Sequence, residues 1–214
     1  MVLDPFESED EDLAKVKEWW KKNGSSAAAG VVIGVALVFG NNWWGNYRTQ
    51  RAENASKIYE QMMIQNAAKQ PEAAQKLGGR LMKDFAATPY AGKGALFIAH
   101  LSYQSGDVEN AQRQLQWAVD NAIEPATIHV ARLRLARILE DKGKLDAALK
   151  LVRREQTGGY TAQYLELEAD LLVAQGDKSL ARKKYRKALG SLAPGLTDAK
   201  TVIRMKLDDL AEAG

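Results

Sequence analysis

The hydrophobic pattern of the chain is dominated by one uncharged stretch near the N-terminus. Residues 23–47 carry no charged side chain, and residues 27–39 are alanine, glycine, valine, isoleucine, leucine and one phenylalanine. Tryptophan pairs flank the stretch at positions 19–20 and 43–44. About twenty helical residues cross the hydrocarbon core of a bilayer, and tryptophan favours the level of the lipid headgroups. The pattern therefore predicts one transmembrane helix over residues 23–46.

A buried helix of a soluble domain and a cleaved signal peptide share part of this pattern. The apolar part is short and glycine-rich, which is unusual for a core helix. A signal peptide begins with a short basic region, whereas a long acidic segment comes first here. No Ala-x-Ala cleavage site follows the apolar part. The sequence thus favours an uncleaved signal anchor over both alternatives.

The basic residues on the two sides of the span indicate its orientation. Four lysines lie within residues 15–22, and three basic residues, Arg48, Arg51 and Lys57, follow the span. Basic residues favour the cytoplasmic side and acidic residues count little in this rule. The excess is small and favours a cytoplasmic N-terminus, with the larger domain across the membrane. In a bacterium, that domain would lie in the periplasm.

A stripe of small residues runs along the predicted span. Ser26, Gly30 and Gly34 are four positions apart and share one face of a helix. Small residues allow close approach of another helix in lipid, so the stripe is a candidate docking face for a second membrane helix. Glycine is also common in membrane helices, and the spacing can arise by chance.

The remainder of the chain has helical periodicity and an internal repeat. Candidate helices cover residues 51–69 and 72–86, and prolines end both. An alanine, a glycine seven positions later and a second alanine five positions after the glycine then recur three times. The three sets are Ala99, Gly106 and Ala111; Ala136, Gly143 and Ala148; and Ala169, Gly176 and Ala181. Because the glycines are 37 and 33 residues apart, the period and pattern match tetratricopeptide repeats.

Each repeated residue has a physical role in a pair of antiparallel helices. The alanines allow a close helix crossing, and the glycine ends the first helix in the left-handed conformation. Asp107 and Asp177 follow two of the glycines as N-cap candidates. Large residues at 115, 152 and 185 fill the gap between helices. A small residue is expected three positions further on, where Ala118 and Ala188 fit the pattern and Glu155 departs from it. Thr197 is a plausible N-cap of a closing helix over residues 197–210.

These patterns predict an all-α fold with a single N-terminal transmembrane helix followed by a tetratricopeptide-like α-solenoid. The expected parts are an acidic cytoplasmic segment at 1–22, the anchor at 23–46 and a helical linker with the first solenoid helices at 47–90. Three repeats at 91–193 and a capping helix at 194–214 complete the chain.

Composition narrows the range of functions. The net charge is only +3, which argues against a dedicated nucleic-acid binder. Cysteine is absent and there are two histidines, so thiol chemistry and a histidine-rich metal centre are not expected. No catalytic motif is present, and the Gly78-Gly79 and Gly158-Gly159 pairs lack the strand–turn–helix context of a phosphate-binding loop. We expect no enzyme activity, no metal site and no cofactor.

The repeat register predicts a partner-binding groove on the concave face of the solenoid. First-helix positions two, five, nine and twelve of each repeat should face this groove, whose mixed apolar and charged character suits a partner helix or an extended chain. A solvated surface with internal ion pairs is the simpler alternative. The expected groove residues are Lys93, Leu96, His100, Tyr103, Val130, Leu133, Arg137, Glu140, Gln163, Glu166, Asp170 and Val173.

The whole chain resembles the bacterial YfgM family, ancillary subunits of the Sec translocon with one membrane helix and a periplasmic tetratricopeptide domain. The residues that carry the resemblance are 16–24, Gly30, Gly34, Trp43, 55–59, 90–99, 176–178 with 181–182, and 205–207. The resemblance implies association with the SecYEG translocon and with a membrane-anchored periplasmic prolyl isomerase of the PpiD type. It further implies a chaperone-like role toward nascent secreted polypeptides.

Two functional classes stay open at this stage. The first is a translocon-associated interaction protein or chaperone. The second is a structural scaffold of the cell envelope that organises division or wall-synthesis proteins without handling clients. The sequence does not separate the two classes.

Overall fold

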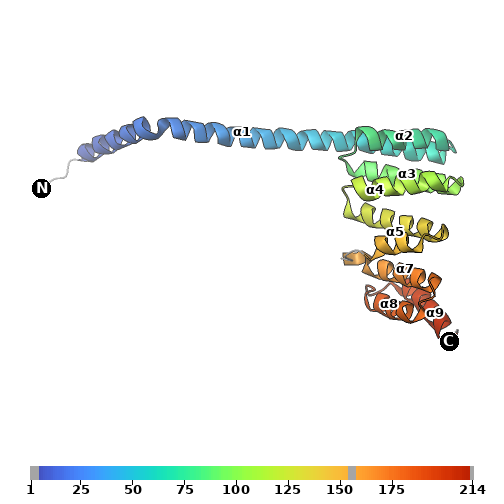
Figure 1. Cartoon of the computed structure of the whole chain (residues 1–214). Coiled ribbons are helices and arrows are strands. Elements are labelled where there is room, and N and C mark those ends of the chain that lie inside the picture. Colours follow the sequence, from blue (N-terminus) through green and yellow to red (C-terminus); the bar gives the residue numbers. More distant parts are fainter. Residues whose placement is uncertain (1–4, 154–157, 213–214) are drawn as a thin grey trace. The chain divides into compact units, whose positions relative to one another are not determined.

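The computed structural model describes residues 5–153 and 158–212, and these ranges contain helices and no strand. The chain divides into two units, residues 1–50 and residues 51–214. The first helix, α1 (Pro5–Ala67), contributes to both units. The predicted all-α fold, with a long apolar helix ahead of a helical array, is confirmed (Figure 1).

The first unit consists of the N-terminal part of α1. From Ala28 onward this helix is long and apolar enough to cross a membrane, and none of its most apolar window is buried by the rest of the described chain. Its tryptophans Trp19, Trp20, Trp43 and Trp44 all stay exposed. An exposed apolar helix bounded by tryptophans is what a membrane anchor requires, because lipid replaces the protein core as its surroundings.

The second unit is a stack of helices (Figure 1). It contains the C-terminal part of α1, then α2 (Pro71–Asp84), α3 (Pro89–Gln104), α4 (Val108–Asn121), α5 (Pro125–Asp141), α6 (Leu145–Val152), a 3-10 turn (Gly158–Tyr160), α7 (Thr161–Ala174), α8 (Lys178–Gly190) and α9 (Thr197–Glu212). Neighbours in sequence from α2 to α9 are neighbours in space, which is the contact pattern of a solenoid.

The repeat spacing holds at the level of single residues. All six repeated alanines are buried, and the large residues Leu115, Val152 and Tyr185 fill the space between helices as expected. The repeated glycines have φ values of 84°, 69° and 88° at positions 106, 143 and 176, in the left-handed region that favours glycine. The side chains of Asp107 and Asp177 cap the following helices by accepting backbone hydrogen bonds of 3.0 Å each. Glu155 lies outside the described residues.

Two apolar clusters stabilise the solenoid. The smaller one joins the end of α1 to α2 through Ala55, Ile58, Met62, Ala74 and Leu81. The larger one extends from α3 to α9 and includes Ile203 and Leu210 of the last helix. The last helix, α9, is therefore part of the core. It begins at Thr197, so Thr197 is its first helical residue and not the N-cap that the sequence predicted. Its role as a cap of the solenoid stays a prediction.

Helices α2 and α3 pack closely against each other at Gly78. A Cβ atom on Gly78 would lie 2.8 Å from two carbon atoms of the Ile98 side chain. The absence of a side chain at Gly78 thus sets the spacing of these helices.

Some predicted boundaries shift by a few residues. The helix expected over 51–69 ends at Ala67, and Lys69 takes a left-handed φ of 57° before α2 begins. Pro71, Pro89 and Pro125 each stand in the first turn of a helix, where the missing amide hydrogen costs nothing. The expected division at 90/91 falls inside the first turn of α3, and those at 22/23 and 46/47 fall inside α1. The division of the chain into functional parts stays a prediction.

Candidate functional site

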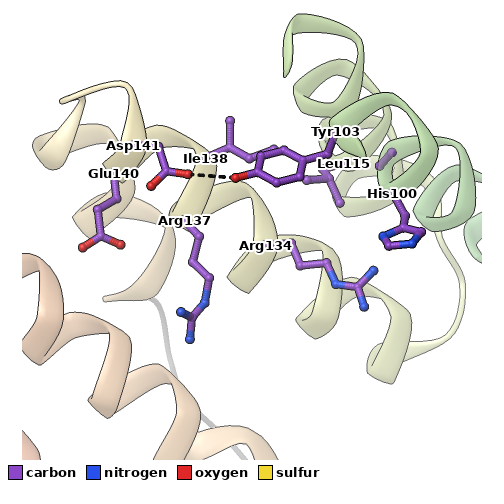
Figure 2. Close-up of a pocket in the computed structure, with 9 residues that line it drawn as sticks. His100, Tyr103, Leu115, Arg134, Arg137, Ile138, Glu140 and Asp141 are labelled. Carbon is purple, nitrogen blue, oxygen red and sulfur yellow. Dashed lines mark hydrogen bonds between the residues drawn. The ribbon is translucent and has the colours of Figure 1, made fainter. Parts of the chain in front are cut away.

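The candidate site is a cavity of about 460 Å³ between α3 and α5, with one residue of α4 in its floor (Figure 2). Its size lies in the range of ordinary ligand pockets. The lining residues are Ala99, His100, Tyr103, Leu115, Arg134, Arg137, Ile138, Glu140 and Asp141.

Four of the predicted groove residues meet in this pocket. His100 and Tyr103 come from α3, and Arg137 and Glu140 come from α5. The two helices are first helices of neighbouring repeats, so the repeat register places residues that are far apart in sequence side by side. The Tyr103 hydroxyl donates a 3.4 Å hydrogen bond to the Asp141 carboxylate and connects the two walls.

Sequence reasoning missed Arg134 and Asp141. Together with Arg137 and Ile138 they form an i, i+3, i+4, i+7 series on α5, so they share one helix face. The repeat template pointed instead to Leu133, which packs against the apolar core. The helical spacing of 134, 137, 138 and 141 was the signal that could have found this face.

Opposite charges occupy different parts of the pocket. Arg134 and Arg137 are exposed, and neither forms an ion pair or side-chain hydrogen bond within residues 5–153 and 158–212. Burial raises the pKa of Glu140, the Asp170 carboxylate raises it further, and Arg137 opposes both effects. A carboxyl group with a perturbed pKa in a cleft is typical of functional sites.

The other predicted groove residues of the first two repeats do not line the pocket. Lys93 pairs with Glu124 at 3.7 Å and lies over the Tyr90 ring. Leu96, like Leu133, packs against the apolar core, and Val130 is half-buried. These positions therefore contribute to packing and ion pairing within the solenoid and do not form one continuous groove with the pocket.

The acidic positions of the third repeat are engaged by the last helix. Lys206 of α9 donates hydrogen bonds to Glu166 at 2.7 Å and to Asp170 at 2.8 and 2.9 Å. The Tyr185 hydroxyl donates to Asp170 at 2.6 Å, and burial followed by this hydrogen bond raises the tyrosine pKa. Gln163 is exposed beside the carbonyls of Gly159 and Tyr160, and Val173 packs against the core. An intramolecular ion cluster thus occupies this end of the predicted groove.

The predicted docking stripe of α1 is open in the described structure. Ser26, Gly30 and Gly34 are exposed, and a Cβ atom on either glycine would have no neighbour within 4 Å. The stripe could therefore accept a second helix backbone without rearrangement of the described residues.

The raised pKa of Glu140 leads to a test. An acid whose pKa is raised by folding binds more protons in the folded state, so its contribution to stability falls as the pH rises above its unfolded value. We expect Glu140→Gln to melt a few degrees above the wild type at neutral pH. The difference should shrink toward a pH of about 4, where an ordinary glutamate takes up its proton. Thermal melts across this pH range measure both effects.

A matched control uses the opposite electrostatic environment. The hydrogen bond from Lys142 lowers the pKa of Glu109, so Glu109→Gln should leave stability unchanged or reduce it slightly at neutral pH. A wild type more stable than Glu140→Gln at neutral pH would mean that Arg137 outweighs burial and Asp170.

Comparison with known proteins agrees with the repeat architecture. Residues 17–212 match the family model of a tetratricopeptide repeat-like domain. The chain is 29% identical to the ancillary SecYEG translocon subunit of Aggregatibacter actinomycetemcomitans, over 84% of this chain and 88% of the relative. It is 28% identical to the Escherichia coli protein of that name over 98% and 100% of the two chains, and 26% identical to that of Haemophilus influenzae over 94% and 97%. The chain therefore belongs to the family with this tetratricopeptide repeat-like domain and, within it, to the YfgM family.

Proposed function

We propose that this protein is a membrane-anchored interaction subunit, ancillary to the Sec translocon, that binds partner polypeptides through the pocket between α3 and α5. The observation that carries the proposal is this pocket with apolar, aromatic and charged walls, formed by two neighbouring repeats of a chain with a candidate membrane anchor. Relatives aligned over most of their length are named as ancillary subunits of the SecYEG translocon.

The proposed arrangement gives the two units different tasks. The anchor docks beside the membrane channel through Ser26, Gly30 and Gly34, because close backbone approach replaces the hydrophobic effect in lipid. The solenoid, on the periplasmic side, presents the pocket to a prolyl isomerase of the PpiD type or to emerging secreted chains. Solenoids suit this task because each repeat adds surface without needing a new core.

Co-purification in mild detergent tests this division of labour. Gly30→Leu with Gly34→Leu keeps the helix apolar but blocks close approach, so recovery of SecYEG should fall about tenfold if close packing accounts for 1–2 kcal/mol of docking. Tyr103→Ala with Arg137→Glu should leave recovery of SecYEG intact. It should reduce recovery of the partner that binds the pocket, such as a prolyl isomerase of the PpiD type. Loss of both partners from both variants, with the solenoid still folded, would show one composite interface and contradict the division.

A matched control for the groove variant is Ile123→Ala with Lys183→Glu. It removes one large apolar side chain that is 48% exposed, close to the 50% of Tyr103, and reverses one charge, at positions that do not line the pocket. Both partners should be retained. Failure of the wild type to recover SecYEG under conditions that preserve the channel would refute the translocon association itself.

A further inference from the structure

Charges in the pocket follow an order along α5. Arg134 and Arg137 come first and Glu140 and Asp141 follow at the end of the helix. On α3, His100 precedes Tyr103, and Tyr103 contacts Asp141. Figure 2 shows His100 and Arg134 at the end of the pocket opposite Glu140 and Asp141. The pocket therefore has a basic end and an acidic end.

The floor between these ends is apolar. Ala99, Leu115 and Ile138 come from three helices, and each is at least nine-tenths buried within the solenoid. The Tyr103 ring adds aromatic surface, and this side chain is half exposed. The floor residues are already almost fully buried, so an apolar side chain of a partner would mainly remove the Tyr103 ring from water, which is favourable in proportion to the area covered.

The basic end is available to an anion. Neither Arg134 nor Arg137 forms an ion pair or a side-chain hydrogen bond within the described ranges, and His100 is exposed at the Arg134 end of the pocket (Figure 2). Arg137 lies between that end and Glu140, whose carboxylate it also attracts. An arginine guanidinium matches the geometry of a carboxylate and can bind it through two parallel hydrogen bonds. At the other end, the Asp141 carboxylate receives from residues 5–153 and 158–212 only the long 3.4 Å bond from Tyr103, and it can accept further hydrogen bonds from a cation.

We infer that the pocket selects its partner by charge order: it takes an extended polypeptide segment with an apolar side chain between a carboxylate and a basic side chain. The carboxylate lies at the arginine end and the basic group at the Glu140–Asp141 end. Arg134 and Asp141 are seven residues apart on a helix, or about 10 Å along its axis. An extended segment covers this distance with about three residues. This inference rests on the proposed function and names the chemistry of the segment that the pocket binds.

Peptide binding to the full chain in nanodiscs tests the inference. The probes are fluorescent capped peptides in which leucine lies between two charged residues, with the pairs glutamate–lysine, glutamate–glutamate and lysine–lysine. The glutamate–lysine peptide should bind the wild type best, by about three- to tenfold, because each exposed charge pair contributes up to about 1 kcal/mol. A fourth peptide replaces glutamate by a free C-terminal carboxylate and shows which source of carboxylate the pocket prefers.

Charge reversal provides the decisive variant. Arg134→Glu with Arg137→Glu makes both ends acidic, so the preference should switch to the lysine–lysine peptide. Misfolding cannot produce such a switch, because it would weaken the binding of all the peptides. Lys183→Glu with Arg186→Glu makes the same change of charge on α8 away from the pocket and should keep the wild-type order.

Two outcomes would overturn the inference: equal binding of all peptides to the wild type, or an unchanged order in the reversed variant. Recovery of SecYEG from the same preparations is scored separately. If SecYEG is recovered but the pocket shows no charge preference, selection by charge order is refuted and the translocon association is not. A clear charge preference without SecYEG would refute the translocon association while supporting the pocket's selectivity.

Discussion

Lys206→Ala is expected to destabilise the solenoid by about 2–3 kcal/mol, and to lower Tm by roughly 5–10 °C. Lys206 is the cation that pairs with both Glu166 and Asp170, whose side chains are only 18% and 17% exposed. Removing it leaves two half-buried carboxylates without their cation. The free-energy penalty is smaller than for a fully buried ion pair, because the Lys206 side chain is 31% exposed. Thermal and urea unfolding of the full chain in detergent measure the loss.

The same ion cluster gives a pH signature and a rescue. Burial lowers the pKa of Lys206, but hydrogen bonds to Asp170 and Glu166 outweigh it and the net pKa is raised. The contribution of Lys206 to folding stability is therefore complete at pH values below the ordinary lysine pKa of about 10.4, and it is lost only as the pH rises above that value. Adding Asp170→Asn to Lys206→Ala should recover part of the stability. Lys200→Ala, an exposed change on the same helix, should stay within about 0.5 kcal/mol. A Lys206→Ala protein as stable as the Lys200→Ala control would show that α9 is held by apolar packing alone.

Local rules explain why much of the fold could be predicted from sequence. Gly106, Gly143 and Gly176 are needed at left-handed helix ends, and Asp107 and Asp177 satisfy the amides that begin the next helices. Each of these requirements involves residues within a few positions of one another. The buried alanines follow from the same register, because only a small side chain fits at a close helix crossing.

The candidate site was harder to predict because it depends on the rotation of α5 and on contacts across repeats. A rotation of about 100° per residue separates Leu133, which faces the core, from Arg134, which faces the pocket. The engagement of Glu166 by Lys206 joins residues 40 positions apart through a helix outside the repeats. No local pattern specifies such a pairing. The sequence placed Glu166 and Asp170 in the predicted groove and left internal ion pairs open as an alternative, and at these two positions the structure shows internal ion pairs.

A reporter enzyme that needs disulfide bonds, fused after Gly214, is expected to be active in a bacterial host. Such a reporter matures only outside the reducing cytoplasm, so activity places the solenoid across the membrane. The physical basis is the excess of basic residues before the span, four lysines in residues 15–22 against Arg48, Arg51 and Lys57 after it. Protease added to spheroplasts should digest the solenoid and leave an N-terminal epitope protected. Each molecule has one orientation or the other, so its reporter is either active or inactive.

Charge changes on the N-terminal side test the cause of this orientation. Replacing the four lysines of residues 15–22 by glutamine leaves the larger basic count after the span, so a fraction of molecules should invert and reporter activity should fall. Neutralising the acidic residues within positions 1–12 is the matched control and should change activity little, because acids contribute little to orientation. An inactive reporter on the unaltered chain, with the solenoid protected from external protease, would place the pocket in the cytoplasm. The pocket could then not meet a periplasmic partner or an exported chain, whatever its charge order.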